Sequence, residues 1–365
     1  METRAVLRRS LPRRDRIRVL VVDDSVVIRR LVTLALQQDA AIDVVGSAPN
    51  GALALERIPQ LKPDLLTLDI EMPVMDGLET LRRLRGPYPE LRVIMFSTLT
   101  ERGAAITFEA LTLGADDYVT KPSNEGSLDR SLERLRNELI PKIKQFFSLP
   151  GDPPVPVSTP PPSTPPLHPS PSSSTPRVVV IGCSTGGPAA LDNLLPRFPT
   201  EFPLPILVVQ HMPAVFTRLL AERLNSKCRL SVCEAKDGEP VLGGKVFIAP
   251  GDFHMRVANS GGKIRVHLDQ SAPQNFCRPA VDALFASIAD VYGPATVAVV
   301  LTGMGHDGLR GAESLKKLGA TIIAQDQQSS VVWGMPGAVT NAGLADNVVP
   351  LDQCAQQILR LASHA

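Results

Sequence analysis

The stretch that decides the fold of the C-terminal half reads Arg177-Val-Val-Val-Ile-Gly-Cys-Ser184-Thr-Gly-Gly-Pro-Ala-Ala190. The apolar run Val178–Ile181 predicts a buried strand, and the serine after it has Gly-x-Ser-x-Gly spacing. This arrangement suits a nucleophilic serine, because glycines tolerate a sharp turn and the helix that follows begins with free N–H donors. The structural alternative is that Ser184 only caps this helix.

The same strand-and-helix alternation continues to the end of the chain. Further apolar runs are Ile206–Val209, Val246–Ile248, Ala295–Leu301 and Ala320–Ala324. Two more segments, Phe253–Val257 and Lys263–Leu268, flank Ala-Asn-Ser-Gly-Gly, which predicts a hairpin on the edge of the sheet. The C-terminal half is therefore predicted to be a doubly wound α/β domain with an edge hairpin.

The N-terminal part alternates in the same way. Its apolar runs are Ile17–Val22, Ile42–Val45, Leu65–Ile70, Val93–Phe96 and Tyr118–Val119. Helical patterns lie between them, and a last helix is expected from Leu128 to Phe147, broken or bent near Pro141. Short buried strands alternating with helices predict a five-stranded parallel sheet that is covered on both faces.

Composition separates the two α/β domains. Twelve of the 34 prolines fall within residues 150–176, among serines and threonines, which predicts an extended spacer. The first sixteen residues carry six arginines and no apolar core of a signal peptide, which favours a solvated basic tail. The predicted organisation is a tail over 1–15, domains over 16–147 and 177–365, and a linker over 148–176.

Charge and cysteine content exclude several classes of protein. A net charge of +1 argues against a nucleic-acid partner, and no apolar run approaches the ~18 residues that span a membrane. The five cysteines have no metal-binding spacing, and their odd number argues against a disulfide framework. We therefore expect a cytoplasmic protein without membrane insertion. Cys183 is expected to pack inside, on the side of the chain opposite Ser184.

Three acids stand at the carboxyl ends of predicted strands in the N-terminal domain: Asp23, Asp24 and Asp69. Ser97 ends the fourth predicted strand and Lys121 follows the fifth. Because such ends meet at one edge of a parallel sheet, the acids predict an oxygen-rich Mg²⁺ site. The lysine ammonium and the serine hydroxyl could then hold a phosphoryl group. The alternative for each residue is a solvated or helix-capping role.

These residues stand in motifs that resemble the receiver domains of two-component signalling, with a flavodoxin-like fold. The motifs are Val21-Val-Asp-Asp-Ser25, Asp69-x-x-Met-Pro-x-Met-Asp-Gly77 and Gly114-Ala-Asp-Asp-Tyr-Val-Thr-Lys-Pro122. The resemblance implies that Asp69 is the phosphoacceptor and that a histidine kinase is the phosphodonor. It also implies Mg²⁺ ligands from Asp23, Asp24, Asp69 and the main-chain carbonyl of Glu71. Ser97 and Tyr118 would be the switch pair, and Lys121 would contact the phosphoryl group.

A nucleophilic serine needs a base and an acid that orients the base. His211 follows the predicted strand Ile206–Val209, and Asp307 lies in a glycine-flanked turn after the strand that ends at Leu301. We expect Ser184, His211 and Asp307 to meet at three strand ends of one sheet. His306 is the rival base, disfavoured because it adjoins Asp307. Singly, His211 could be a core or loop histidine and Asp307 a turn residue.

Six motifs around these residues resemble the catalytic domain of the chemotaxis protein-glutamate methylesterase family (CheB). They are Ile181–Pro188, Val209–Pro213, Ile248–Gly251, Arg278–Asp282, Leu301–Gly308 and Gly334–Pro336. The resemblance implies that Ser184 is the nucleophile, His211 the base and Asp307 its orienting acid. The main-chain amides of Thr185 and Met304 would form the oxyanion hole, and no cofactor is expected in this domain.

The resemblance also implies the reaction and its partner. The reaction is hydrolysis of glutamate γ-methyl esters on the cytoplasmic helices of methyl-accepting chemoreceptors, with glutamine deamidation in many members. We expect the unphosphorylated receiver to cover the catalytic cleft and phosphorylation to weaken that cover. Two alternatives stay open: a phosphorylation-dependent receptor-binding module without turnover, and the same esterase in a non-flagellar pathway.

Overall fold

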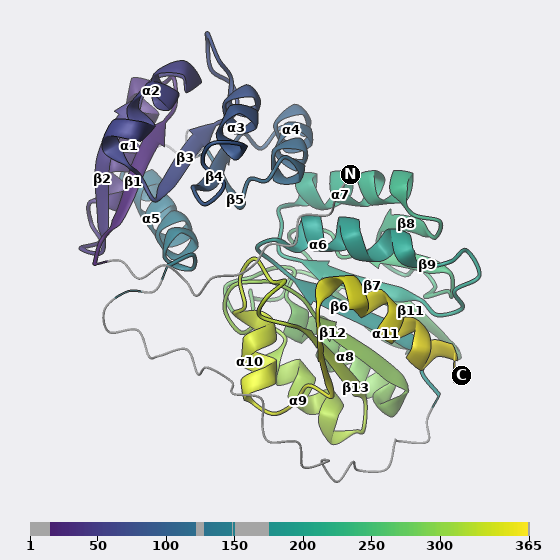
Figure 1. Cartoon of the computed structure of the whole chain (residues 1–365). Coiled ribbons are helices and arrows are strands. Elements are labelled where there is room, and N and C mark those ends of the chain that lie inside the picture. The colour runs from purple at the N-terminus through teal and green to yellow at the C-terminus, as the bar shows by residue number, and fades with distance from the viewer. Residues whose placement is uncertain (1–14, 122–127, 148, 150–174, 364–365) are drawn as a thin grey trace. The chain divides into compact units, whose positions relative to one another are not determined.

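The structure is a computed structural model that describes residues 15–121, 128–147, 149 and 175–363. These residues fall into two compact units, one before and one after residue 150. Figure 1 shows that each unit is a sheet with helices on both of its faces. The predicted basic tail and nearly all of the predicted linker lie outside the described residues.

The N-terminal unit has a five-stranded parallel sheet of order β2-β1-β3-β4-β5. The strands are β1 (Ile17–Val22), β2 (Ile42–Ala48), β3 (Leu65–Asp69), β4 (Arg92–Ser97) and β5 (Asp117–Thr120). The helices are α1 (Val26–Leu36), α2 (Gly51–Leu61), α3 (Gly77–Arg85), α4 (Glu101–Thr112) and α5 (Leu128–Lys144). This topology confirms the prediction.

Both faces of this sheet are covered, since α1 packs against α5 while α3 packs against α2 and α4. The central strands are buried almost completely, as expected for parallel strands between two helical layers. Helix α5 runs through Pro141 without ending there, so of the two predicted outcomes, a break or a bend, the break is absent. The helix ends at Lys144, three residues before the predicted end.

The C-terminal unit has a seven-stranded parallel sheet of order β14-β13-β12-β6-β7-β9-β8. The strands are β6 (Val178–Cys183), β7 (Ile206–Gln210), β8 (Ser231–Glu234), β9 (Lys245–Ile248), β12 (Thr296–Val300), β13 (Thr321–Gln325) and β14 (Asn347–Val349). The sequence predicted five of these strands, and the two that it missed, β8 and β14, are the sheet's edges.

Helices cover the two faces of this sheet in separate groups (Figure 1). One group packs around α6 and contains α6 (Gly187–Leu194), α7 (Ala214–Lys227) and α11 (Leu351–Ser363). The other packs around α9 and contains α8 (Val281–Val291), α9 (Leu309–Lys317) and α10 (Met335–Asn341). The chain leaves β6 toward β7 on one side and later returns to β12 on the other. The strand order therefore reverses at β6, and such a switch point is where open α/β sheets bind ligands.

The predicted hairpin is present, but it does not extend the edge of the sheet. Strands β10 (His254–Ser260) and β11 (Lys263–Asp269) form their own two-stranded antiparallel sheet. Strand β10 packs against α8, and the amide of Val257 donates a 3.1 Å hydrogen bond to Ser287 Oγ of that helix. The Gly-Gly turn identified the hairpin, but nothing in the local sequence identified its packing partner.

Candidate active site and receiver site

Ser184 and His211 are the residues that follow two paired strands. Cys183 at the end of β6 is the register partner of Gln210 at the end of β7. The His211 amide continues the ladder with a 3.3 Å hydrogen bond to the Cys183 carbonyl. Since neighbouring strands lie ~4.8 Å apart, the two residues occupy adjacent positions at the carboxyl edge of the sheet.

Asp307 reaches the site from the other side of β6, in the loop between β12 and α9. Its Oδ2 lies 2.8 Å from His211 Nε2 and accepts a 2.6 Å hydrogen bond from the Val281 amide. Its Oδ1 accepts from the Asp282 amide at the start of α8 and from Asn275 Nδ2. Burial opposes ionisation of this carboxyl, but His211 and the amides lower its pKa to about 2. Asp307 is therefore an ionised partner for the imidazole.

The two ring nitrogens of His211 face different groups. Nε2 faces Asp307, and Nδ1 lies 3.5 Å from the Sγ of Cys277. Burial alone would lower the pKa of His211, but hydrogen bonds with Asp307 and Cys277 raise it to about 10. Because Nε2 is engaged by the carboxylate, Nδ1 is the nitrogen left for proton exchange with a substrate or nucleophile.

The loop after β12 passes directly against Ser184. A Cβ on Gly303 would lie 2.9 Å from Ser184 Cβ and 2.3 Å from Met335 Sδ, so only glycine fits there. The Ser184 amide donates to the Thr302 carbonyl, and the Thr302 hydroxyl donates to the Thr185 carbonyl. The two residues with predicted oxyanion amides therefore flank Ser184: Thr185 is next in sequence, and Met304 follows the glycine that touches it.

Neither His306 nor His254 takes this position beside Asp307 in the structure. His306, the rival base, is exposed, and the imidazole bonded to Asp307 is that of His211. His254 is fully buried, accepts from the Ala280 amide and contacts the Ala272 carbonyl, as a structural histidine does. Cys183 is buried with its Sγ 3.7 Å from the Val209 carbonyl, which confirms its expected packing role.

Three residues near the predicted triad were missed by sequence reasoning. Asn275 Nδ2 donates to Asp307 at 2.8 Å and to Asp282 at 2.9 Å, and Cys277 contacts His211. Gln210 Nε2 donates to the Ser184 carbonyl at 3.0 Å. Asn275 and Cys277 lie in an irregular loop without periodicity, so no local signal marks them. Gln210 is a polar residue at the end of a buried strand beside a candidate base, which was a usable signal.

The acids and the lysine predicted for the receiver meet at the carboxyl edge of the N-terminal sheet. Oxygens of Asp23, Asp24 and Asp69 lie within 4.8 Å of one another. Lys121 Nζ lies 2.9 Å from Asp23 Oδ2 and 2.8 Å from Asp69 Oδ2. Burial raises the pKa of Asp69 to about 6, with Asp23 adding to the effect and Lys121 opposing it. One ammonium does not compensate three crowded carboxylates, and such a set of oxygens fits Mg²⁺.

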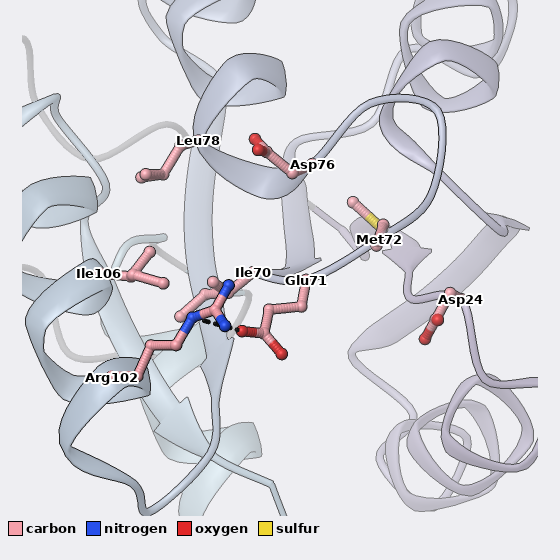
Figure 2. A pocket seen from close by; sticks show the side chains of 8 residues that line it. All are labelled: Asp24, Ile70, Glu71, Met72, Asp76, Leu78, Arg102 and Ile106. Carbon is pink, nitrogen blue, oxygen red and sulfur yellow. Dashed lines mark ion pairs between the residues drawn. The ribbon is translucent and has the colours of Figure 1, made fainter.

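Asp24, Asp69, Glu71 and Lys121 line a cavity of ≈ 270 Å³ at this edge. A neighbouring pocket of ≈ 410 Å³ also includes Asp24 and Glu71 (Figure 2). In Figure 2 the Glu71 side chain turns toward Arg102 of α4 and away from Asp24, and the ion pair measures 3.3 Å. The Glu71 carboxylate therefore lies outside the aspartate cluster, which leaves its main chain as the candidate ligand.

The predicted switch residues lie on the two neighbouring strands β4 and β5. Ser97 is buried, accepts a 2.8 Å hydrogen bond from Thr107 Oγ1 and donates to the Thr98 carbonyl. Tyr118 is buried as well, and burial raises the pKa of its phenol well above the usual range. Both side chains thus start from packed positions.

Within the described ranges, no helix combines the length and apolar character that crossing a bilayer requires.

Comparisons with known families divide the chain in the same way. Residues 179–358 match the CheB methylesterase family, and residues 19–133 match the response regulator receiver domain family. A crystal structure of the Thermotoga maritima CheB methylesterase catalytic domain is 48% identical, with a TM-score of 0.50. It covers 51% of this chain, and the match includes 98% of that domain.

Full-length relatives extend the match over both units. A protein-glutamate methylesterase/protein-glutamine glutaminase of Trichodesmium erythraeum is 49% identical, with 94% of this chain and 98% of that protein covered. A relative of the same description from a Nocardioides species is 51% identical, with 94% and 95% covered. Identity of this size over nearly the whole of both chains confirms the resemblance found in the motifs. The chain belongs to the CheB methylesterase family and carries that family's catalytic domain behind a response regulator receiver domain.

Proposed function

We propose that this protein hydrolyses glutamate γ-methyl esters on the cytoplasmic helices of chemoreceptors and releases methanol, with Ser184 as nucleophile. One observation carries the proposal: Ser184 and His211 follow paired residues of β6 and β7, and His211 is bonded to a buried, ionised Asp307. These are the three groups that acyl transfer by serine needs.

The proposed reaction assigns different roles to the two ring nitrogens of His211. His211 takes the Ser184 proton on Nδ1, because Nε2 is engaged by Asp307. The serine oxygen attacks the ester carbonyl, His211 returns the proton to the leaving methoxide, and methanol departs. Water then repeats the sequence on the acyl-enzyme and restores the glutamate.

The oxyanion is assigned to the main-chain amides of Thr185 and Met304. The close contact between Gly303 and Ser184 supports this assignment, because it brings the chain before Met304 against the nucleophile. The helix α6 that begins at Gly187 adds a favourable dipole to the same side. Glutamine deamidation would use the same steps, and it depends more strongly on His211 because ammonia must leave protonated.

Methanol release from a methylated receptor fragment tests this function. Ser184→Ala should reduce the rate by roughly 10⁶, whereas Ser226→Ala, an exposed serine on α7, should leave it unchanged. If Ser184→Ala loses turnover but still binds the receptor, the loss is one of catalysis and not of receptor binding. Turnover by the parent chain would exclude a module that only binds. A rate that survives in Ser184→Ala would contradict the assignment of the nucleophile.

For the receiver we propose that Asp69 accepts a phosphoryl group from a histidine kinase. Asp23, Asp24, Asp69 and the Glu71 carbonyl would hold Mg²⁺, which supplies positive charge for the phosphoryl oxygens. Lys121 already contacts the Asp69 carboxylate and can follow an oxygen of the phosphoryl group. Ser97 would then exchange its bond from Thr107 for the phosphoryl group, and Tyr118 would respond on the next strand.

We further propose that the unphosphorylated receiver covers the active site and that phosphorylation weakens this cover. Phosphorylation of Asp69 replaces one carboxylate charge by a phosphoryl group of about −1.5 to −2 charges, so this edge of the sheet becomes more negative. A few kcal/mol of bias is enough to shift such a two-state population. The fragment 177–365 should then outperform the unphosphorylated whole chain, and an Asp69→Asn chain should not respond to a small phosphodonor. Equal rates of fragment and whole chain would contradict occlusion.

The receptor pathway is a separate question from the chemistry. The same esterase could serve flagellar chemotaxis or another chemosensory pathway, and both would use the site described above. Measuring methanol release from methylated receptors of each pathway in one organism separates the two candidates.

A further inference from the structure

A phenylalanine stands fully in solvent next to the catalytic base. Phe276 has a relative exposure of 103%, the highest among the exposed large apolar side chains of the described residues. It is followed by Cys277, whose Sγ contacts His211, and preceded by Asn275, which bonds Asp307. Exposing an apolar ring to water costs free energy. A ring that stays exposed beside the proposed catalytic residues is therefore a candidate for binding a partner or substrate.

The segment that carries the ring is a tight turn. Gln274 and Cys277 exchange both main-chain hydrogen bonds, at 3.0 and 2.8 Å, and the two residues between them have positive φ, 50° for Asn275 and 63° for Phe276. This is a two-residue turn of the kind that favours Asn-Gly. Phenylalanine stands where glycine would relax the backbone, so the turn displays the ring at a conformational cost.

Two residues of the turn, the central Asn275 and the closing Cys277, hold it against neighbouring side chains. Asn275 donates from Nδ2 to Asp307 and Asp282, and its Oδ1 accepts from Arg310 Nη2 at 3.4 Å. Cys277 closes the turn against the imidazole. The ring therefore has a fixed relation to the base and the acid, which a freely moving loop would not give it.

The ring lies near the proposed active site, whereas most of the other exposed apolar residues of this unit lie elsewhere on it. On the C-terminal unit these are Phe276, Met304, Leu242, Leu318 and Val348, within the described residues. Leu242 and Leu318 precede the strands β9 and β13 and so lie at the amino edge of the sheet, and Val348 lies in the edge strand β14. The carboxyl edge, where the triad lies, carries Phe276 beside His211 and Met304 beside the glycine that touches Ser184.

We propose that Phe276 selects the substrate by binding an apolar side chain of the helix that carries the esterified glutamate. This inference rests on the function proposed above and adds which feature of the substrate helix the site recognises. Residues three or four positions apart lie on one face of a helix, so the ring would contact an apolar residue about one turn from the ester. A small ester without a helix has no such residue and receives no help from Phe276.

The test uses two alanine-based helical peptides, each with one glutamate γ-methyl ester. One carries leucine four residues before and four after the ester, and the other carries serine at both positions. The whole parent chain, activated by a small phosphodonor, should prefer the leucine peptide by about 10-fold in kcat/KM, mainly through KM.

Phe276→Gly should remove this preference, and because glycine suits a φ of 63° the turn itself should survive. Phe276→Leu should retain part of the preference. Leu318→Ala, a matched loss of an exposed apolar side chain at the opposite edge, should keep all of it.

Four results would overturn the inference. One is an unchanged preference in Phe276→Gly, and another is no preference in the parent chain. The third is faster hydrolysis by unphosphorylated Phe276→Gly, which would assign the ring to contact with the receiver. If the parent releases methanol from a methylated receptor but hydrolyses neither peptide, the inference fails while the proposed function stands. If it releases methanol from neither, the proposed function itself is wrong.

Discussion

The Sγ of Cys277 lies 3.5 Å from Nδ1 of His211, the ring nitrogen that faces away from Asp307. A thiol thus lies beside the nitrogen on which His211, as the proposed base, would accept a proton. Together with Asp307 it raises the pKa of His211 to about 10. The charged imidazole cannot act as a base, so the neutral form available for catalysis increases as the pH rises.

This contact predicts the pH dependence of the esterase. Cys277→Ala removes one of the two groups that favour the imidazolium, so the folded pKa of His211 should fall. The acidic limb of kcat/KM should move to lower pH by about 1 pH unit, and activity at pH 7 should rise by up to about 10-fold. Cys228→Ala, a thiol on the end of α7, serves as the control. A limb that stays in place would show that the thiol does not influence the base.

Asn275 is predicted to position Asp307 without taking part in the reaction. Asn275→Ala removes donors from two neighbouring carboxylates, so Asp307 should lose orientation and its pKa should rise. We expect kcat to fall about 10-fold with little change in KM, and a smaller loss in Asn275→Gln. Steady-state kinetics check this, with circular dichroism as a measure of folding. An unchanged kcat with intact folding would leave Asn275 with a structural role alone.

Gly303 is predicted to accept no larger residue. A Cβ there would lie 2.3 Å from Met335 Sδ and 2.9 Å from Ser184 Cβ, so Gly303→Ala must displace one of them. Such overpacking costs about 1–3 kcal/mol of unfolding free energy and should move the nucleophile, with a loss of at least about 100-fold in rate. Gly86→Ala serves as the control, because Gly86 also has a φ outside the left-handed region (−73°) and a Cβ there would meet no neighbour within 4 Å. Equal activity of the two variants would contradict the close packing.

The receiver should become less stable as Asp69 ionises. The folded pKa of Asp69, about 6, lies above the ordinary value of 3.8 for an aspartate, so the folded receiver binds more protons between these two pH values. Its stability should therefore fall as the pH rises from about 4 to about 6, and added Mg²⁺ should restore it at pH 7. Asp69→Asn should stabilise the receiver at pH 7 by up to about 3 kcal/mol.

Calorimetry of the receiver transition, with Asp43→Asn as a carboxylate control outside the cluster, measures this effect. Greater stability of the parent at pH 7 than at pH 4 without Mg²⁺ would contradict the prediction.

The sequence predicted the frame of the site better than its surroundings. Strand ends in a parallel sheet share one edge, so Asp23, Asp69 and Lys121, and likewise His211 and Asp307, could be grouped before their distances were known. The edge strand β14 was missed because it has only three residues and no continuous apolar run. Asn275 was missed because its partner Asp307 lies 32 positions away and no periodic element connects them.

The reversal of strand order at β6 has a consequence for how the catalytic domain folds. Ser184 precedes and Asp307 follows most of the domain. They come to the same edge of the sheet only when β6 pairs with β12 across more than a hundred intervening residues. Contacts of such separation form slowly, because a long loop must close before they contribute. A newly made chain is therefore expected to stay inactive until β6 and β12 have paired.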